Sequence, residues 1–242
     1  MAHSVGEAER LMVWDQIVEF VRDPLTWSGP DSIPVLLWEH IWISVVSTVV
    51  AAVLVFPPAL WLGHNRKGAE VAGAVVNIGR AIPSFGILVL SVMVMLELGV
   101  SVLSPWGVMV ALIALAAPPI FTNTIAGLQG VSPATVEAAR GMGMRERQLI
   151  RRVEVPLASP VILEGLRIAF VQVIATATLG ALVAWGGLGR LIVDGFSQQN
   201  QGKLLVGAIL VAVLAVIAEI GLAQAQRVST PQGLRPRHDQ GI

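Results

Sequence analysis

The side chains best suited to specific chemistry are concentrated in one stretch of this chain, EAARGMGMRERQLIRRVEVP, at residues 137–156. It holds eight charged residues in twenty positions, although only 13% of the 242 residues are charged and 55% are hydrophobic. Arg147 and Arg151 lie four positions apart, a mildly unfavourable like-charge spacing on a helix. An acidic surface on another protein, or anionic lipid, would relieve that repulsion. The stretch is therefore a candidate binding surface, and an ordinary solvated loop is the alternative.

Residue arrangements typical of enzymes do not stand out. The chain has no cysteine, which excludes disulfides, thiolate chemistry and Cys-type zinc sites, and its four histidines are widely dispersed. A nucleotide-binding P-loop needs Lys followed by Ser or Thr, whereas Lys67 precedes Gly68 and Lys203 precedes Leu204. We expect no catalytic residue, no metal, no cofactor and no nucleic-acid partner, so that any ATP hydrolysis belongs to another chain.

The elements that must carry this stretch are membrane helices. Mean hydropathy is +0.74, and the apolar residues come in long blocks. A run of about 18 or more largely apolar residues can cross the hydrocarbon layer of roughly 30 Å as a helix. Five stretches qualify, at residues 41–62, 77–98, 107–128, 168–185 and 204–222. The sequence predicts an all-α, polytopic membrane protein with about five transmembrane helices and membrane lipid as a partner.

The distribution of basic residues orients these spans. Eleven arginines and lysines fall on the side of residues 66–67, 140–167 and 227–237, and four fall on the other side. The positive-inside rule then places the amino terminus outside and the carboxyl terminus in the cytoplasm. Most tryptophans fit as interfacial anchors, with Trp61 near the inner boundary and four near the outer one: Trp38, Trp42, Trp106 and Trp185.

This orientation divides the chain into three parts. Residues 1–39 form an extracytoplasmic segment, residues 40–226 the transmembrane domain, and residues 227–242 a cytoplasmic tail. In the first part, Trp14, Ile17, Val18 and Val21 recur at helical spacing, which predicts a short amphipathic helix. We expect it to lie on the membrane or on the protein's outer face, and a plain packing element is the alternative.

The charged stretch then lies in a long cytoplasmic connection, residues 129–167. Ser132 and Pro133 have the types favoured at the N-cap and first position of a helix. Gly141 and Gly143 allow a sharp turn, and a second helix follows over residues 144–153. Pro156 and Pro160 are expected to end that second helix.

The spacing of this connection resembles the EAA loop of ATP-binding-cassette importer permeases. That pattern is EAA, three residues, Gly, nine residues, then Ile-x-Leu-Pro, and here Val153 and Val155 replace the two aliphatic residues. The resemblance implies a type I importer permease fold, with a helix-turn-helix loop that docks in a cleft of a separate ATPase subunit. The residues it implicates in ATPase coupling are Glu137, Ala138, Ala139, Arg140, Gly141, Gly143, Arg147, Arg151 and Pro156.

Further stretches resemble the osmoprotectant branch of these permeases, which imports glycine betaine, carnitine, choline or proline-type solutes. They include RAIPSFGILVL at residues 80–90, PPIFTNTIAGL at 118–128 and GGLGRLI at 186–192. The resemblance implies a prokaryotic cell-membrane complex. Its parts are two permease subunits, the second being a copy of this chain or a related one, two ATPase subunits that carry ATP and Mg, and an extracytoplasmic solute-binding protein.

Two alternatives stay open at this point. One is a permease of the same fold for another small solute, such as an amino acid. The other is an ion-coupled secondary transporter, for which ionisable residues within spans are the pointer. Arg80 and Glu219 are the candidates, but each lies close to the cytoplasmic end of a span, where it can snorkel to the interface.

Prolines and small polar residues inside the spans are candidates for the translocation path. A proline within a helix leaves a carbonyl without its helical donor, and that carbonyl must face protein or a water-lined cavity. Helix kinking and hydrogen bonding between helices are the alternative roles. The candidates are Pro83, Ser84, Pro118, Pro119, Asn123, Thr124, Thr176 and Thr178.

Overall fold

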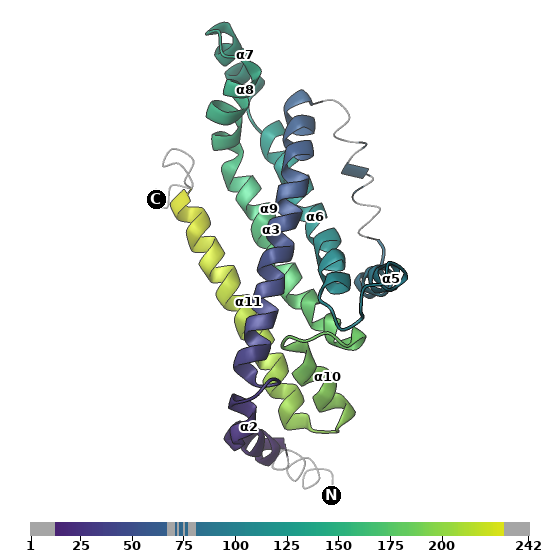
Figure 1. The fold of residues 1–242 in the computed structure, drawn as a ribbon. Helices are drawn as coiled ribbons and strands as arrows, with labels where there is room; N and C mark the ends of the chain where they lie inside the picture. Colours follow the sequence, from purple (N-terminus) through teal and green to yellow (C-terminus); the bar gives the residue numbers. More distant parts are fainter. Residues whose placement is uncertain (1–12, 67–70, 72, 75, 77–80, 230–242) are drawn as a thin grey trace, which may run out of the picture. The chain divides into compact units, whose positions relative to one another are not determined.

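The computed structural model describes residues 13–66, 71, 73–74, 76 and 81–229, and their regular structure is entirely helical (Figure 1). Residues 13–22 are helical, as predicted. The remaining helices are α2 (Pro24–Trp27), α3 (Ile33–Asn65), α5 (Ser84–Glu97), α6 (Trp106–Gln129), α7 (Pro133–Gly141), α8 (Glu146–Leu149), the π-helix η1 (Ile150–Glu154), α9 (Val155–Ala177), the 3₁₀-helix η2 (Thr178–Val183), α10 (Gly189–Ser197) and α11 (Gln201–Ser229).

Four helical segments are long and apolar enough to cross a membrane: Ile33–Asn65, Trp106–Gln129, Glu146–Val183 and Gln201–Ser229. The first of these, α3, has 33 residues and is about 50 Å long, well beyond the thickness of the hydrocarbon layer. Four of the five predicted spans coincide with these segments.

The span predicted at residues 77–98 is not one continuous helix. Residues 77–80, which include Arg80, lie outside the described residues, and residues 81–83 are not helical. Pro83 has an extended backbone (φ −56°, ψ 132°), so α5 begins only at Ser84. The helix ends near Gly99, whose φ is +80°. Its 14 residues reach about 21 Å, less than the hydrocarbon thickness.

The prediction that Pro156 and Pro160 end a helix is wrong, because α9 contains both. The π-turn of η1 shifts the ladder here, since the Val155 N–H donates to the Ile150 carbonyl five residues back. Pro160 has no N–H for the Pro156 carbonyl, and the Ser159 hydroxyl donates to that carbonyl instead, at 2.9 Å. The fourth span therefore starts well before residue 168, and the connection shortens to residues 130–154.

Contacts group the described residues into two units. The first lies within residues 1–47, 83–113 and 172–217, and its core contains Ile33, Leu36, Leu188 and Leu191. The helix over residues 13–22 packs into this unit through Phe20, and the Gln16 Oε1 accepts a hydrogen bond from the Gln201 N–H at 2.9 Å. Trp14 on this helix is 64% exposed. That the helix lies on the membrane stays a prediction.

Two features of the first unit differ from expectation. Trp185, predicted as an interfacial anchor, is only 7% exposed, because it packs over Gly180 and Gly187. The sequence also gave no sign that Glu39 and His40 of α3 hold the chain near η2. The Glu39 carboxylate accepts from the Gly187 N–H at 2.9 Å, and the His40 Nε2 donates to the Ile174 carbonyl at 2.9 Å.

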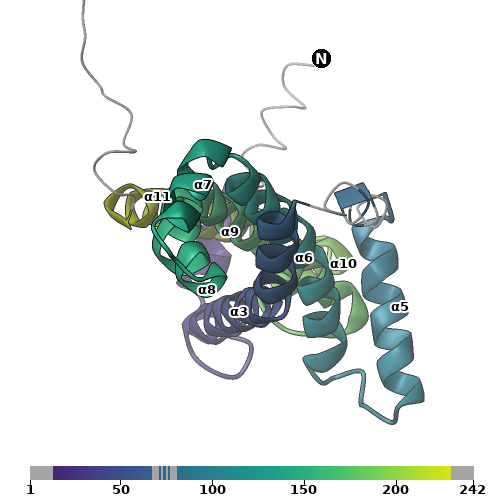
Figure 2. The ribbon, with the colours of Figure 1, turned by 90° about the horizontal axis from the view of Figure 1, so that it is seen from above.

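The second unit lies within residues 48–82, 114–171 and 218–242 and contains the charged connection. In it, α6 and α9 cross closely at Gly165. A Cβ built on that glycine would lie 2.7 Å from the Pro119 carbonyl oxygen and 2.5 Å from the Asn123 Cβ. Beyond the start of α9, α7 and α8 lie beside each other (Figures 1 and 2). The loop is thus built directly on the helices that span the membrane.

Candidate functional site

The 130–154 loop begins with the predicted helix. Ser132 occupies the N-cap position of α7 and Pro133 its first turn, although the Ser132 hydroxyl makes no capping bond. Proline is favourable there because its fixed φ suits the first turn, where no N–H is needed. The predicted start of this helix at Ser132 and Pro133 is therefore confirmed, although without the side-chain cap.

The turn after α7 depends on Gly143. Its φ is +81°, a left-handed conformation that side chains with a Cβ rarely adopt. The Gly143 N–H donates to the Arg140 carbonyl at 2.9 Å and the Met144 N–H to the Ala139 carbonyl at 3.3 Å, the pattern of a Schellman cap. Gly141 stays within α7, so the expectation that both glycines make the turn is wrong: only Gly143 does.

The second helix is α8 continued by η1, close to the predicted range. The Gln148 side-chain oxygen accepts a hydrogen bond from the Arg145 N–H at 3.0 Å, which satisfies an unpaired donor at the start of α8. Both loop helices rest on an apolar core. Its buried members are Leu128, Val131, Val136, Ala139, Leu149, Ala158 and Ile162.

This core divides the predicted coupling residues into two groups. Ala139 is buried in it and Pro156 is partly buried. The others are exposed: Glu137, Ala138, Arg140, Gly141, Gly143, Arg147 and Arg151. Arg145 and Arg152 are exposed as well, so the outer face of the loop carries a concentration of positive charge. The Arg140 guanidinium donates to both Glu146 oxygens, at 3.0 and 3.1 Å, and this interaction raises the pKa of Arg140.

The loop also contacts a buried histidine of α3 that sequence reasoning missed. His64 lies near the end of α3 with a side chain only 7% exposed. Its Nδ1 contacts the Glu154 carboxylate at 2.6 Å, and its Nε2 contacts the Glu146 carboxylate at 2.9 Å. Two residues later, the Arg66 Nη2 donates to the Val131 carbonyl at 2.7 Å. The partners are 82 to 90 positions apart (146 − 64 and 154 − 64), so no local pattern could have revealed them.

The residues predicted for the translocation path fall in both units. Pro118, Pro119, Asn123 and Thr124 belong to α6, where Asn123 donates to the Pro119 carbonyl and Thr124 to the Ile120 carbonyl. In the first unit lie Pro83 and Ser84 at the start of α5, and Thr176 and Thr178, which donate to the Gln172 and Ala175 carbonyls. Asn123 and the three threonines thus each bond to a carbonyl of their own chain segment.

Of the two ionisable residues that were candidates for ion coupling, the structure describes only Glu219. Arg80 lies outside the described residues. Glu219 of α11 pairs with Arg167 of α9, whose Nη1 lies 3.3 Å from the Glu219 carboxylate. Arg167 also contacts Glu164 at 2.6 Å. Among the residues described, no cluster of three or more His, Cys, Asp or Glu side chains could hold a metal ion.

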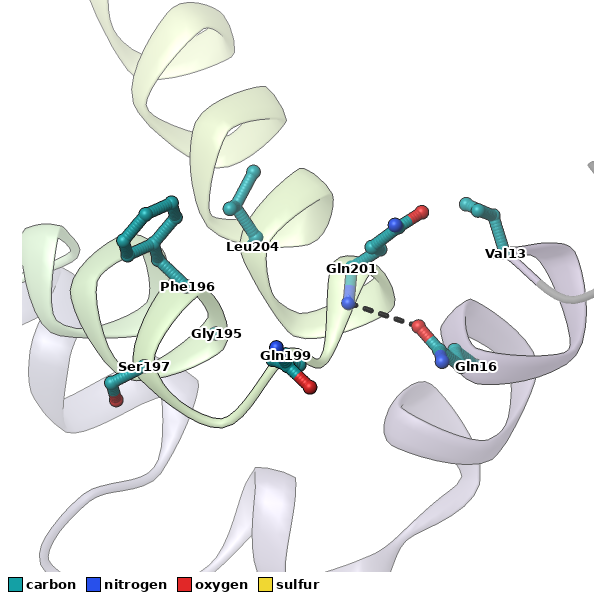
Figure 3. A pocket seen from close by; sticks show the side chains of 8 residues that line it. All are labelled: Val13, Gln16, Gly195, Phe196, Ser197, Gln199, Gln201 and Leu204. Atoms are coloured by element: carbon teal, nitrogen blue, oxygen red, sulfur yellow. Dashed lines mark hydrogen bonds between the residues drawn. The ribbon is translucent and has the colours of Figure 1, made fainter. Parts of the chain in front are cut away.

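A separate cavity of about 790 Å³ lies in the first unit, between the helix over residues 13–22 and the connection from α10 to α11 (Figure 3). Its lining is made of amides, a hydroxyl and apolar groups: Val13, Gln16, Gly195, Phe196, Ser197, Gln199, Gln201 and Leu204. None of these side chains titrates near neutral pH, so the cavity offers no acid or base.

Comparison with known proteins gives a consistent result. A family model described as "binding-protein-dependent transport system inner membrane component" matches residues 44–227. The carnitine transport permease protein OpuCB of Listeria monocytogenes is 33% identical over 227 residues, which cover 94% of this chain and 99% of that protein. The choline transport system permease protein OpuBB of Bacillus subtilis is 34% identical over 198 residues, which cover 82% and 88% of the two chains.

Among solved structures, a chain of the inward-facing MetNI methionine ABC transporter superposes with a TM-score of 0.70. It is 24% identical in sequence, and the match covers 80% of this chain and 94% of the other. At that identity the likeness concerns the fold.

The loop core predicts a local stability effect. Leu149 is fully buried, so Leu149→Ala should cost about 2–5 kcal/mol and increase local opening of the loop. Trypsin should then cleave faster after Arg145, Arg147, Arg151 and Arg152, as followed by mass spectrometry in detergent. Leu157→Ala, at a position 39% exposed on α9, is the control and should change the rate little. Equal cleavage rates in both variants would contradict this account of the core.

Proposed function

This chain belongs to the family of binding-protein-dependent transport system inner membrane components, and we propose that it imports osmoprotectants such as glycine betaine, carnitine or choline as the permease subunit of an ATP-driven transporter. It is a transporter subunit, not an enzyme. The observation that carries the choice of solute is the full-length likeness to a carnitine permease, 94% of one chain against 99% of the other. An amino acid is the second candidate solute, because the fold alone does not distinguish the two classes.

In this proposal the 130–154 loop docks on a separate ATPase subunit, which binds ATP and Mg. The exposed arginines of the loop are fixed on a buried apolar core, so they can meet an acidic cleft without a large loss of side-chain and loop entropy. The Gly143 turn holds α7 and α8 together as a compact projection. Glu137 and Ala138, exposed on α7, belong to the same contact surface.

The rest of the transporter is a second permease subunit and an extracytoplasmic solute-binding protein. Quaternary ammonium groups are usually held by several aromatic faces. This chain has no tyrosine, and four of its tryptophans, at 38, 42, 61 and 106, are exposed on helices that can cross the membrane. We therefore assign high-affinity recognition to the binding protein, while the path through Pro83, Ser84, Pro118, Pro119, Asn123, Thr124, Thr176 and Thr178 passes solute with little affinity.

The complex lies in the cell membrane of a prokaryote. We propose that the amino terminus is outside and that the 130–154 loop and the carboxyl terminus are cytoplasmic, as the count of basic residues indicates. The helix over residues 13–22 then lies at the outer surface, and residues 227–242 extend into the cytoplasm.

The solute is tested by reconstituting the chain with its ATPase and binding protein in proteoliposomes. We expect ATP hydrolysis to increase when glycine betaine, carnitine or choline is added, and uptake to persist after the proton gradient is collapsed at constant ATP. Stimulation by methionine alone would move the assignment to an amino-acid permease. Loss of uptake on collapse of the gradient would favour ion coupling.

The docking role is tested at Gly143. Gly143→Asp places a side chain at a φ of +81°, which costs about 1 kcal/mol or more and displaces the projection. We expect the variant to reach the membrane but to lose ATPase co-purification or solute-stimulated hydrolysis. Glu137→Ala should weaken the same step less, and solute binding to the external binding protein should not change.

Two controls separate backbone conformation from charge. Gly143→Asn matches Gly143→Asp in size and in its tolerance of left-handed backbone but lacks the charge, so it should lose docking to a similar extent if the backbone conformation decides the effect. Gly141→Asp adds the same charge at an exposed helical position with open space around it, and it should affect docking less than Gly143→Asp. Normal co-purification and normal stimulated hydrolysis in Gly143→Asp would contradict the docking role.

The orientation is tested with single cysteines, since the chain has none of its own. Ser101→Cys and Ser132→Cys both introduce the thiol at exposed positions. In intact cells an impermeant thiol reagent should label position 101, while position 132 should react only after the cells are opened. The reverse pattern would overturn the proposed orientation.

A further inference from the structure

His64 connects three elements through a buried ionic contact. The ring lies near the end of α3, and its two nitrogens face carboxylates from η1 and α8, at 2.6 Å to Glu154 and 2.9 Å to Glu146. The Glu154 side chain is only 1% exposed, so its charge is almost completely removed from solvent. A buried carboxylate is strongly unfavourable unless it is paired, and His64 is the partner that the structure provides.

Counting donors shows how the contact is satisfied. An ionised carboxylate only accepts hydrogen bonds, and an imidazole ring donates from both nitrogens only when both carry hydrogen. The two contacts of His64 therefore need two hydrogens shared among the ring and the two carboxyl groups, and they hold the ring between Glu154 and Glu146. Hydrogen bonds in which one partner is ionised are shorter and about twice as strong as neutral ones.

The contact continues to α7. Glu146 accepts from the Arg140 guanidinium, so that close contacts connect Arg140, Glu146, His64 and Glu154 in one series. We call these four residues the His64 bridge. Within it the Arg140 charge is paired with Glu146, so the charge of the exposed side of the loop is set by the other loop arginines.

Most other contacts at this end of α3 are apolar. Phe56 and Leu60 of α3 pack against the loop core, and Gly63 allows the close approach of Leu128 of α6. Apolar packing of this kind favours contact but tolerates small sliding movements, whereas hydrogen bonds specify one register. The Arg66 guanidinium, directly after α3, fixes the start of the loop at Val131, and the His64 bridge fixes the α8–η1 segment.

We propose that His64 is a positioning residue for coupling: it links both ends of the α8–η1 segment to α3, so that movement of the loop displaces this part of α3 with it. The inference rests on the proposed docking of the loop on an ATPase. It adds that α3 receives the movement, through a charged group and not only through apolar contact.

The test uses the complete transporter in proteoliposomes and measures solute taken up per ATP hydrolysed. His64→Gln keeps a polar side chain, but both of its N–H donors are on one nitrogen, so it cannot face the two carboxylates from opposite sides as the imidazole ring does. We expect the ATPase still to co-purify, while uptake per ATP falls about fivefold or more. Asn65→Gln, at the exposed neighbouring position on α3, is the control and should keep the wild-type ratio.

A double-mutant cycle separates positioning from stability. Glu154→Gln alone should lower the same ratio, and His64→Gln with Glu154→Gln should be no worse than either single change, because both remove one shared contact. The double variant also removes the uncompensated buried charge, so it should fold even where His64→Gln alone is depleted. Amounts of folded permease are matched before the ratios are compared.

The outcomes separate this inference from the proposed function. If the wild-type complex hydrolyses ATP without any solute stimulation, the proposed function fails. If the wild type is coupled but His64→Gln and the double variant keep its uptake per ATP, the positioning role is overturned. An additive loss in the double variant would also overturn it, since the two residues would then act separately.

Discussion

Hydrocarbon offers no hydrogen bonds, so every backbone N–H and C=O of this chain that enters the membrane must find its partner within the protein. Helices satisfy this requirement locally, yet the spans contain several prolines, each of which leaves one carbonyl without its helical donor. In α9 the Pro156 carbonyl lacks its helical donor because residue 160 is proline, and the Ser159 hydroxyl bonds this carbonyl instead. The requirement therefore decides where small polar side chains occur as much as any contact with solute does.

The same requirement explains which parts of the fold could be predicted. Long apolar runs and the Pro133 and Gly143 signals act locally, so the spans, the start of α7 and the turn after it follow from neighbouring residues. Pro156 was misleading because its effect depends on a π-turn that moves the hydrogen bonds by one residue. Proline marks a helix end in water more reliably than in a long membrane helix, where the freed groups are bonded again by side chains.

The candidate site was predictable only on its outer face. The spacing from Glu137 to Pro156 identifies the loop, and the exposed arginines are visible as a charge cluster. His64 and Glu154 were not identifiable, because their meaning depends on a contact across 90 positions (154 − 64). Trp185 shows the same limit, since a tryptophan near a span end is typical of the interface, while the neighbouring Gly180 and Gly187 provide space to bury it.

The arrangement of charge in the loop follows from the cost of burial. A charge without solvent must be paired, so the buried Glu154 is matched with His64 and the pair is fixed in place. A charge in solvent costs little, so Arg145, Arg147, Arg151 and Arg152 can be exposed at high density with only weak repulsion at physiological ionic strength. An acidic partner would reduce that repulsion. The inner pair, His64 and Glu154, is buried, so a partner would not change its interaction energy much. In the proposed docking on an ATPase, the outer arginines therefore provide the attraction, and the inner pair keeps the geometry of the loop constant.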